Sequence, residues 1–71
     1  NETERAHREA AELAARFPAS RAANRLLGQT REPKGDLEGA RRAYLHTLTM
    51  YPDDTLSRQA LQRLGNTPPA R

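Results

Sequence analysis

Apolar residues recur at the three- and four-residue spacing of an amphipathic helix in four segments of the chain. The first segment spans residues 3–17, the second follows Ser20 and frays around residues 30–32, the third lies between Asp36 and Pro52, and the fourth follows Asp53 or Asp54. The expected inward positions are Ala6, Ala10, Leu13, Ala14 and Phe17; Ala22, Ala23, Leu26 and Leu27; Leu37, Ala40, Tyr44, Leu45, Leu48 and Tyr51; and Leu56, Ala60, Leu61 and Leu64. The pattern predicts four helices.

Residues with special backbone preferences separate these segments. Pro18 and Pro52 end the first and third helices, because the residue before a proline avoids the α region. Ser20 and Asp36 are suited to be N-caps, and Gly65 stands where a left-handed C-terminal cap is expected. Connections this short make consecutive helices antiparallel neighbours. Residues 66–71 contain two consecutive prolines and are predicted to be a flexible tail or linker.

The chain also repeats itself with a period of 34 residues. Pro18 and Pro52 are separated by this interval, and the same offset relates Ala6 to Ala40 and Leu27 to Leu61. The segments "ARFPAS" and "TMYPDD" read as the same helix ending written twice. A two-helix period of this length is internal evidence for a solenoid.

These residues resemble the tetratricopeptide repeat (TPR) family, and residues 21–54 look like one full repeat. The positions that carry the likeness are Leu27, Gly28, Gly35, Ala40, Tyr44 and Pro52. Residues 1–18 are similar to the second helix of a preceding repeat, and residues 55–65 to the first helix of a following one. The resemblance implies an all-α, antiparallel helix-turn-helix solenoid fragment of four helices, with a repeat domain over residues 1–65.

The sequence departs from the family pattern at three positions. The family usually has aromatic residues where this chain has Asn24 and Arg31, and a small residue where it has Thr47. A weaker likeness, in the run from Tyr51-Pro52 to Leu64-Gly65, is to bacterial envelope TPR proteins. Both the cytoplasm and the bacterial periplasm or envelope remain open as the compartment.

The composition agrees with a helical chain that has a thin core. There is no Val, Ile, Trp or Cys, so a β-sheet fold is close to excluded and no disulfide or cysteine-built metal site can form. Twelve basic and nine acidic side chains give a net charge of +3. Many opposite charges lie four residues apart within a predicted helix and are expected to form ion pairs. The pairs are Glu4 with Arg8, Arg5 with Glu9, Arg8 with Glu12 and Glu12 with Arg16 in the first helix, and Glu38 with Arg42 in the third. No apolar run is long enough for a membrane span.

The candidate chemical groups do not assemble into a catalytic or metal-binding motif. His7 and His46 lack a second imidazole one turn away, and Asp53-Asp54 read as a helix start. Ser20 and Ser57 read as a cap and a first-turn residue, and residues 33–36 as a turn that lacks the spacing of a phosphate loop. The chain is therefore predicted to be no enzyme and to hold no cofactor or metal.

The TPR resemblance implies that the first helix of each repeat lines a concave groove for a peptide or protein partner. The candidate groove residues are Ala22, Arg25, Leu26, Gln29, Gln59 and Arg63. The arginines could pair with carboxylates of a partner. We therefore predict a non-catalytic protein–protein interaction module or scaffold.

The sequence also bears on two other functions. The apolar stripes on residues 3–17 and 55–65 allow self-association into a homo-oligomer, or intramolecular docking in a larger bacterial protein. RNA binding through Arg41-Arg42 and other arginines is disfavoured, because stacking aromatics at an exposed face are missing. We expect no nucleic-acid partner.

Overall fold

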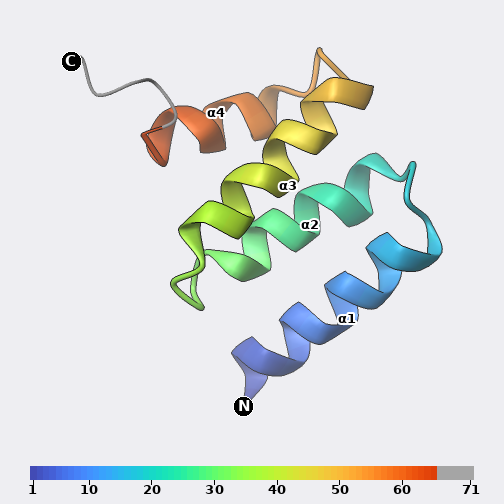
Figure 1. The fold of residues 1–71 in the computed structure, drawn as a ribbon, viewed down its shortest axis with the longest axis vertical. Coiled ribbons are helices and arrows are strands. Elements are labelled where there is room, and N and C mark those ends of the chain that lie inside the picture. Colours follow the sequence, from blue (N-terminus) through green and yellow to red (C-terminus); the bar gives the residue numbers. More distant parts are fainter. Residues whose placement is uncertain (66–71) are drawn as a thin grey trace.

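The computed structural model describes residues 1–65 and contains four helices and no strand in that range (Figure 1). The helices are α1 (Glu2–Arg16), α2 (Arg21–Arg31), α3 (Leu37–Met50) and α4 (Thr55–Arg63). The predicted all-α class and the order of four helices are confirmed. The predicted tail at residues 66–71 lies outside the described residues.

Each helix begins at a side chain that caps it. The capping oxygens of Asn1, Ser20, Asp36 and Asp54 each accept a hydrogen bond from the backbone N–H three residues later. Such bonds satisfy amides that have no partner within the helix. The predicted caps at Ser20 and Asp36 are confirmed, and Asp54 caps the fourth helix rather than Asp53.

The turn from α1 to α2 has the same geometry as the turn from α3 to α4. Phe17 and Tyr51 end their helices with φ/ψ of −126°/72° and −132°/79°, and each N–H donates to the carbonyl four residues earlier. The N–H groups of Ser20 and Asp54 then donate to Phe17 and Tyr51, both at 3.0 Å. The 34-residue period in the sequence is therefore also a repeat in backbone conformation.

The helices form a single thin layer, with principal extents of 36 × 26 × 14 Å. Consecutive helices run in opposite directions and pack side by side, α1 on α2, α2 on α3 and α3 on α4 (Figure 1). The contact between α2 and α3 is the most extensive. As a result, α1 and α4 lie on opposite sides of the central α2–α3 pair.

The core lies where α3 meets α2 and α4. Ala40, Tyr44, Ala60 and Leu61 form a buried cluster, against which Leu48 and Leu64 pack. Gly28 of α2 faces the ring of Tyr44 so closely that a Cβ atom at residue 28 would lie 2.8 Å from the ring carbons. The TPR-like positions Gly28, Ala40 and Tyr44 thus meet at the closest approach of two helices.

Several large apolar side chains predicted to face inward are exposed instead. Leu26, Leu37, Leu45 and Leu56 are among them, as are Leu13 and Phe17. Polar side chains occupy some of the buried positions, namely Asn24, Thr47, Asp54 and Ser57. The inward prediction is confirmed for Ala10, Ala23, Ala40, Tyr44, Ala60 and Leu61, which are buried. The helices pack through these mostly small residues, which bring the backbones close and leave neighbouring leucines at the edge of the contact.

The predicted ion pairs along single helices were also wrong. Among residues 1–65, none of the five predicted pairs lies within ion-pair distance. Glu4 pairs at 3.0 Å with Lys34, and Glu38 pairs with Arg41 rather than Arg42. Most ion pairs therefore connect different elements of the fold.

Candidate functional site: the face of α2 and α4

Helices α2 and α4 run in the same direction and are joined at both ends by polar contacts. Arg25 in the first half of α2 pairs with Asp54 at the start of α4, and Glu32 at the end of α2 pairs with Arg63 at the end of α4. The two pairs span 29 and 31 positions of the chain. Because the two offsets are nearly equal, α2 and α4 run in the same direction, with their starts close together and their ends close together. We describe this arrangement as parallel and in register.

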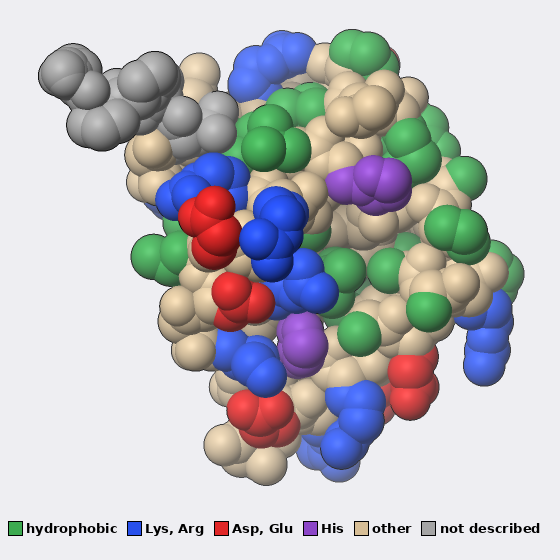
Figure 2. All heavy atoms as spheres, in the orientation of Figure 1, with side chains coloured by type: hydrophobic (Ala, Val, Ile, Leu, Met, Phe, Trp, Pro, Cys, Tyr) green, Lys and Arg blue, Asp and Glu red, His purple; other side chains and the backbone are tan. Residues whose placement is uncertain are grey.

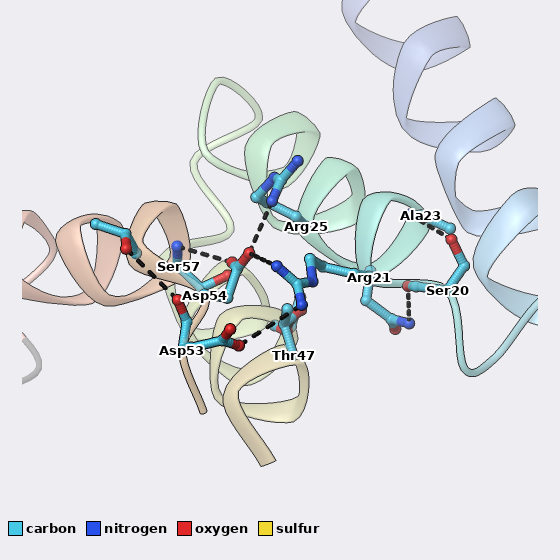
Figure 3. Close-up of polar contacts among 11 residues, drawn as sticks. Ser20, Arg21, Ala23, Arg25, Thr47, Asp53, Asp54 and Ser57 are labelled. Atoms are coloured by element: carbon cyan, nitrogen blue, oxygen red, sulfur yellow. Dashed lines mark hydrogen bonds and ion pairs between the residues drawn. The ribbon is translucent and has the colours of Figure 1, made fainter. Parts of the chain in front are cut away.

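The first polar contact is an ion-pair cluster built around Asp54 (Figure 3). The Arg25 guanidinium donates to Asp54 Oδ1 at 2.8 Å, and Arg21 lies 3.7 Å from the same oxygen and 3.6 Å from Asp53. The backbone N–H of Ser57 donates to Asp54 Oδ2 at 3.1 Å. One carboxylate thus caps α4 and attaches it to α2.

The environment of Asp54 favours its charged form. Burial raises the pKa of this carboxyl group, but the nearby Ser57 hydroxyl, the backbone N–H of Ser57 and the charge of Arg25 outweigh burial, so the pKa lies below its ordinary value. Asp54 is only 2% exposed. A buried charge is tolerated here because each of its two oxygens accepts a hydrogen bond, one from Arg25 and one from the Ser57 N–H.

The second cluster joins three helices through Glu32, Tyr44 and Arg63. The Tyr44 hydroxyl of α3 donates to Glu32 Oε2 at 2.5 Å. Arg63 donates to both carboxylate oxygens, at 2.6 and 3.3 Å, in the fork geometry typical of arginine.

These contacts change the acidity of two groups in opposite directions. The hydrogen bond from Arg63 is the main reason why the pKa of Glu32 lies below its ordinary value, and the bond from Tyr44 adds to it. Burial, followed by the bond to Glu32, raises the pKa of the Tyr44 phenol. Both shifts preserve an ionised carboxylate that accepts from a neutral phenol.

The six candidate groove residues divide into two groups. Arg25 and Arg63 are engaged by Asp54 and Glu32 within the chain. The other four, Ala22, Leu26, Gln29 and Gln59, are exposed. The arginines therefore hold the two helices together, which the sequence pattern did not indicate.

The structure adds one residue that the sequence analysis assigned to the core. Leu56 of α4 is 52% exposed and stands at the position equivalent to Ala22 of α2. It shares a helix face with Gln59 and Arg63 at the three- and four-residue spacing of a helix. We call the exposed surface of these parallel helices the α2–α4 face; it consists of Ala22, Leu26, Gln29, Leu56, Gln59 and Arg63.

A shallow hollow lies at the other edge of α2, against α1. It has a volume of about 280 Å³ and is lined by Glu2, Thr3, Ala6, Gln29, Thr30 and Pro33. This volume is at or below the lower end of small-molecule sites, which is near 300 Å³. Of the candidate groove residues, Gln29 is the one that reaches it.

Two residues that depart from the family pattern make polar contacts of their own. The Asn24 amide donates to the carbonyls of Pro18 and Ser20, at 3.0 and 2.8 Å, and thereby holds the α1–α2 turn. Arg31 donates to the Gly39 carbonyl at 3.0 Å and lies 3.4 Å from His7 Nε2. The sequence indicated that these two sites are unusual, because polar residues stand where TPR repeats usually have aromatic ones. It did not indicate which groups the two side chains would contact.

Charged side chains of both signs are interspersed on the surface. In the view of Figure 2, Lys and Arg alternate with Asp and Glu along one side, while hydrophobic side chains are spread over the rest. Within the part of the chain that the structure describes, no group of His, Asp or Glu side chains is arranged to hold a metal ion. In the same range, no helix has both the length and the apolar character needed to cross a bilayer.

In comparisons with protein-family models, curated proteins and solved structures, nothing matches this chain.

Proposed function

We propose that this chain is a non-catalytic, TPR-like interaction module that binds an extended segment of a partner protein on the α2–α4 face. The observation that carries the proposal is the pair of exposed leucines, Leu26 and Leu56, on two parallel helices fixed in register. Apolar side chains held on a rigid surface can accept a partner with little loss of conformational entropy in the module itself.

The polar residues around these leucines suit a peptide backbone. Gln29 and Gln59 are exposed, and each amide can both donate and accept a hydrogen bond. The Arg63 side chain is 60% exposed although its guanidinium pairs with Glu32, so a partner carboxylate can approach it from solvent. The expected partner segment carries spaced apolar side chains with polar or acidic residues between them.

The repeat supplies a second line of support. The equivalence of the two turns implies that α2 and α4 occupy corresponding positions, as the first helices of successive repeats do in the TPR-like interpretation. Ala22 of α2 and Leu56 of α4 are corresponding positions and both are exposed, which supports placing Leu56 on the same side of the layer as Ala22 and its helix neighbour Leu26.

The test is a selection of twelve-residue peptides from a displayed random library, with the immobilised full chain as bait. Selected peptides should lose roughly tenfold or more in affinity for the double variant Leu26→Glu/Leu56→Glu, because one tenfold step corresponds to about 1.4 kcal/mol of lost contact. Affinity is measured by fluorescence anisotropy of labelled peptides.

The matched control is the double variant Leu37→Glu/Leu45→Glu on α3. Those leucines are 46% and 43% exposed and lie outside the α2–α4 face, so the same chemical change is made elsewhere. The control should bind as the wild type does. Equal losses in both variants, or no loss in the first, contradict the proposal.

A further inference from the structure

Helix α1 presents an apolar stripe that no other part of residues 1–65 covers. By the 34-residue repeat, α1 corresponds to α3, but α3 packs between α2 and α4 whereas, within residues 1–65, the extensive contact of α1 is with α2. Ala40 and Thr47 of α3 are completely buried, while their counterparts Ala6 and Leu13 are exposed, Leu13 by 40%. Phe17 extends the stripe and is 52% exposed.

The charges beside this stripe have no ion-pair partners within residues 1–65. They are Glu2, Arg5, Arg8, Glu9, Glu12 and Arg16, all on α1. All other acidic side chains in that range take part in an ion pair. Unpaired charges of both signs therefore concentrate on the helix whose apolar side chains are also uncovered.

We propose that this face of α1 binds the same face of α1 in a second copy of the chain, with the two helices antiparallel. When α1 is turned end for end about a two-fold axis near Glu9, its large Leu13 meets the partner's small Ala6. In the same arrangement Arg5 lies beside the partner's Glu12, and Glu2 beside the partner's Arg16. Each of these contacts occurs twice, as a two-fold axis requires.

The charge sequence is what favours a second copy as the occupant. An antiparallel pairing of α1 with itself brings opposite charges together at both ends of the contact, so the face is complementary to itself. By contrast, the counterpart surface of α4 exposes Arg58 and Gln62, which offer no apolar match for Leu13 and Phe17 in a head-to-tail stack.

The dimer is expected to be weak. Its apolar contact rests on Leu13 and Phe17 with small residues around them, and Glu9 lies close to its own copy near the axis. Contacts of this size belong to the transient class of interfaces. We expect dissociation constants on the order of 0.1–1 mM.

Sedimentation equilibrium of the full chain, from roughly 10 µM to about 2 mM, tests the proposal. The wild type should rise from one toward two chains in apparent mass over this range. Arg5→Glu and Glu12→Arg should each remain monomeric, because each places like charges opposite one another. The double variant Arg5→Glu/Glu12→Arg should recover dimerisation, because it restores opposite charges with the signs exchanged.

Circular dichroism at 222 nm checks that every variant is folded. If Arg5→Glu or Glu12→Arg loses helix content, Leu13→Asn is tested in its place, with Leu45→Asn on α3 as the matched control. Leu13→Asn should abolish the dimer, and Leu45→Asn should leave it intact. A wild type that stays monomeric at the highest concentration overturns the proposal. So does a folded double variant that fails to dimerise, or a charge variant that dimerises as the wild type does. None of these changes touches the α2–α4 face, so peptide binding there is tested independently.

Discussion

Gly28 determines how closely α2 approaches α3. Its missing side chain leaves the space that the Tyr44 ring fills, and the ring in turn carries the hydroxyl that reaches Glu32. One small residue therefore positions both an apolar contact and a polar cluster. The sequence indicated the close approach through Gly28, Ala40 and Tyr44, but not the hydrogen bond that depends on it.

Gly28→Ala should lower the free energy of unfolding by about 1–3 kcal/mol, because the new methyl group would sit 2.8 Å from ring carbons held in the core. Urea unfolding followed by circular dichroism measures the loss. In a Tyr44→Leu background the same change should cost at least about 0.5 kcal/mol less, since contacting residues are coupled. Equal costs in the two backgrounds would mean that the ring is not what Gly28 accommodates.

Ser20 and Ser57 occupy similar helix starts but differ in their hydrogen bonds. The Ser20 hydroxyl accepts from the Ala23 N–H at 3.1 Å, whereas the buried Ser57 hydroxyl lies near Asp54 but makes no hydrogen bond of normal geometry within residues 1–65. Ser20→Ala should therefore lower the free energy of unfolding by about 1 kcal/mol. Ser57→Ala should be neutral or stabilise by up to about 0.5 kcal/mol, because it removes an unsatisfied polar group and improves helix propensity. The reverse order in urea unfolding would contradict this account.

Helix ends and the small residues of the core could be predicted from the sequence, whereas the exposure of several large apolar side chains could not. Pro18, Ser20 and Gly65 act through their own backbone or the next turn, so their local pattern was enough. Which large side chains are buried depends on the neighbouring helix, and for this reason the pattern predicts a buried Leu56 and only a capping role for Asp54. The ion pairs from α2 to α4 connect residues about 30 positions apart, so no helical spacing could have indicated them.

The attachment of α4 to α2 should weaken in acid. The pKa values of Asp54 and Glu32 are lowered in the folded chain from ordinary values of 3.8 and 4.5. As the pH falls below these ordinary values, the unfolded chain binds more protons than the folded chain does. The stabilisation from ionised Asp54 and Glu32 is therefore complete above about pH 5 and is lost as the pH falls through the folded pKa values. Urea unfolding at pH 7, 5 and 3 should show little change in the first interval and a decrease in the second.

Asp54→Asn separates this contribution from general acid sensitivity. Asp54→Asn should lower the free energy of unfolding by about 1–3 kcal/mol at pH 7, because a neutral amide replaces a carboxylate that two arginines contact. For the same reason the free energy of unfolding should decrease less between pH 7 and pH 3 than it does in the wild type. Asp53→Asn is the control, since that side chain is 81% exposed and should change stability at pH 7 by less than about 0.5 kcal/mol. An unchanged pH profile in Asp54→Asn would place the acid-sensitive contact elsewhere.

As a whole, the molecule is one layer of helices with a small core, and this is consistent with the shortage of large apolar residues in its composition. Ala40 and Ala60 contribute little buried area, so Tyr44 and Leu61 supply much of the buried apolar surface. The charges that do not serve the fold gather on α1, at one edge of the layer. The apolar core and the proposed self-association face of α1 therefore lie in different parts of the molecule.

Leu61→Ala should unfold much of the population at 25 °C. Removing a buried leucine typically costs 2–5 kcal/mol, which is comparable to the roughly 3–5 kcal/mol that a core of this size supplies. Leu45→Ala, at a 43% exposed position, should cost less than about 1 kcal/mol. Thermal unfolding by circular dichroism compares the two. Similar melting temperatures would show that the core is not where the structure places it.

The matching turns after Phe17 and Tyr51 make the chain extensible. Because both junctions leave one helix and enter the next with similar backbone angles, a second copy of residues 18–51 could be spliced in at either junction without designing a new loop. Each added unit would bring another Gly28–Tyr44 contact and another first helix beside α2 and α4. Tandem duplication is thus a short genetic step from this sequence to a longer array with a wider binding surface.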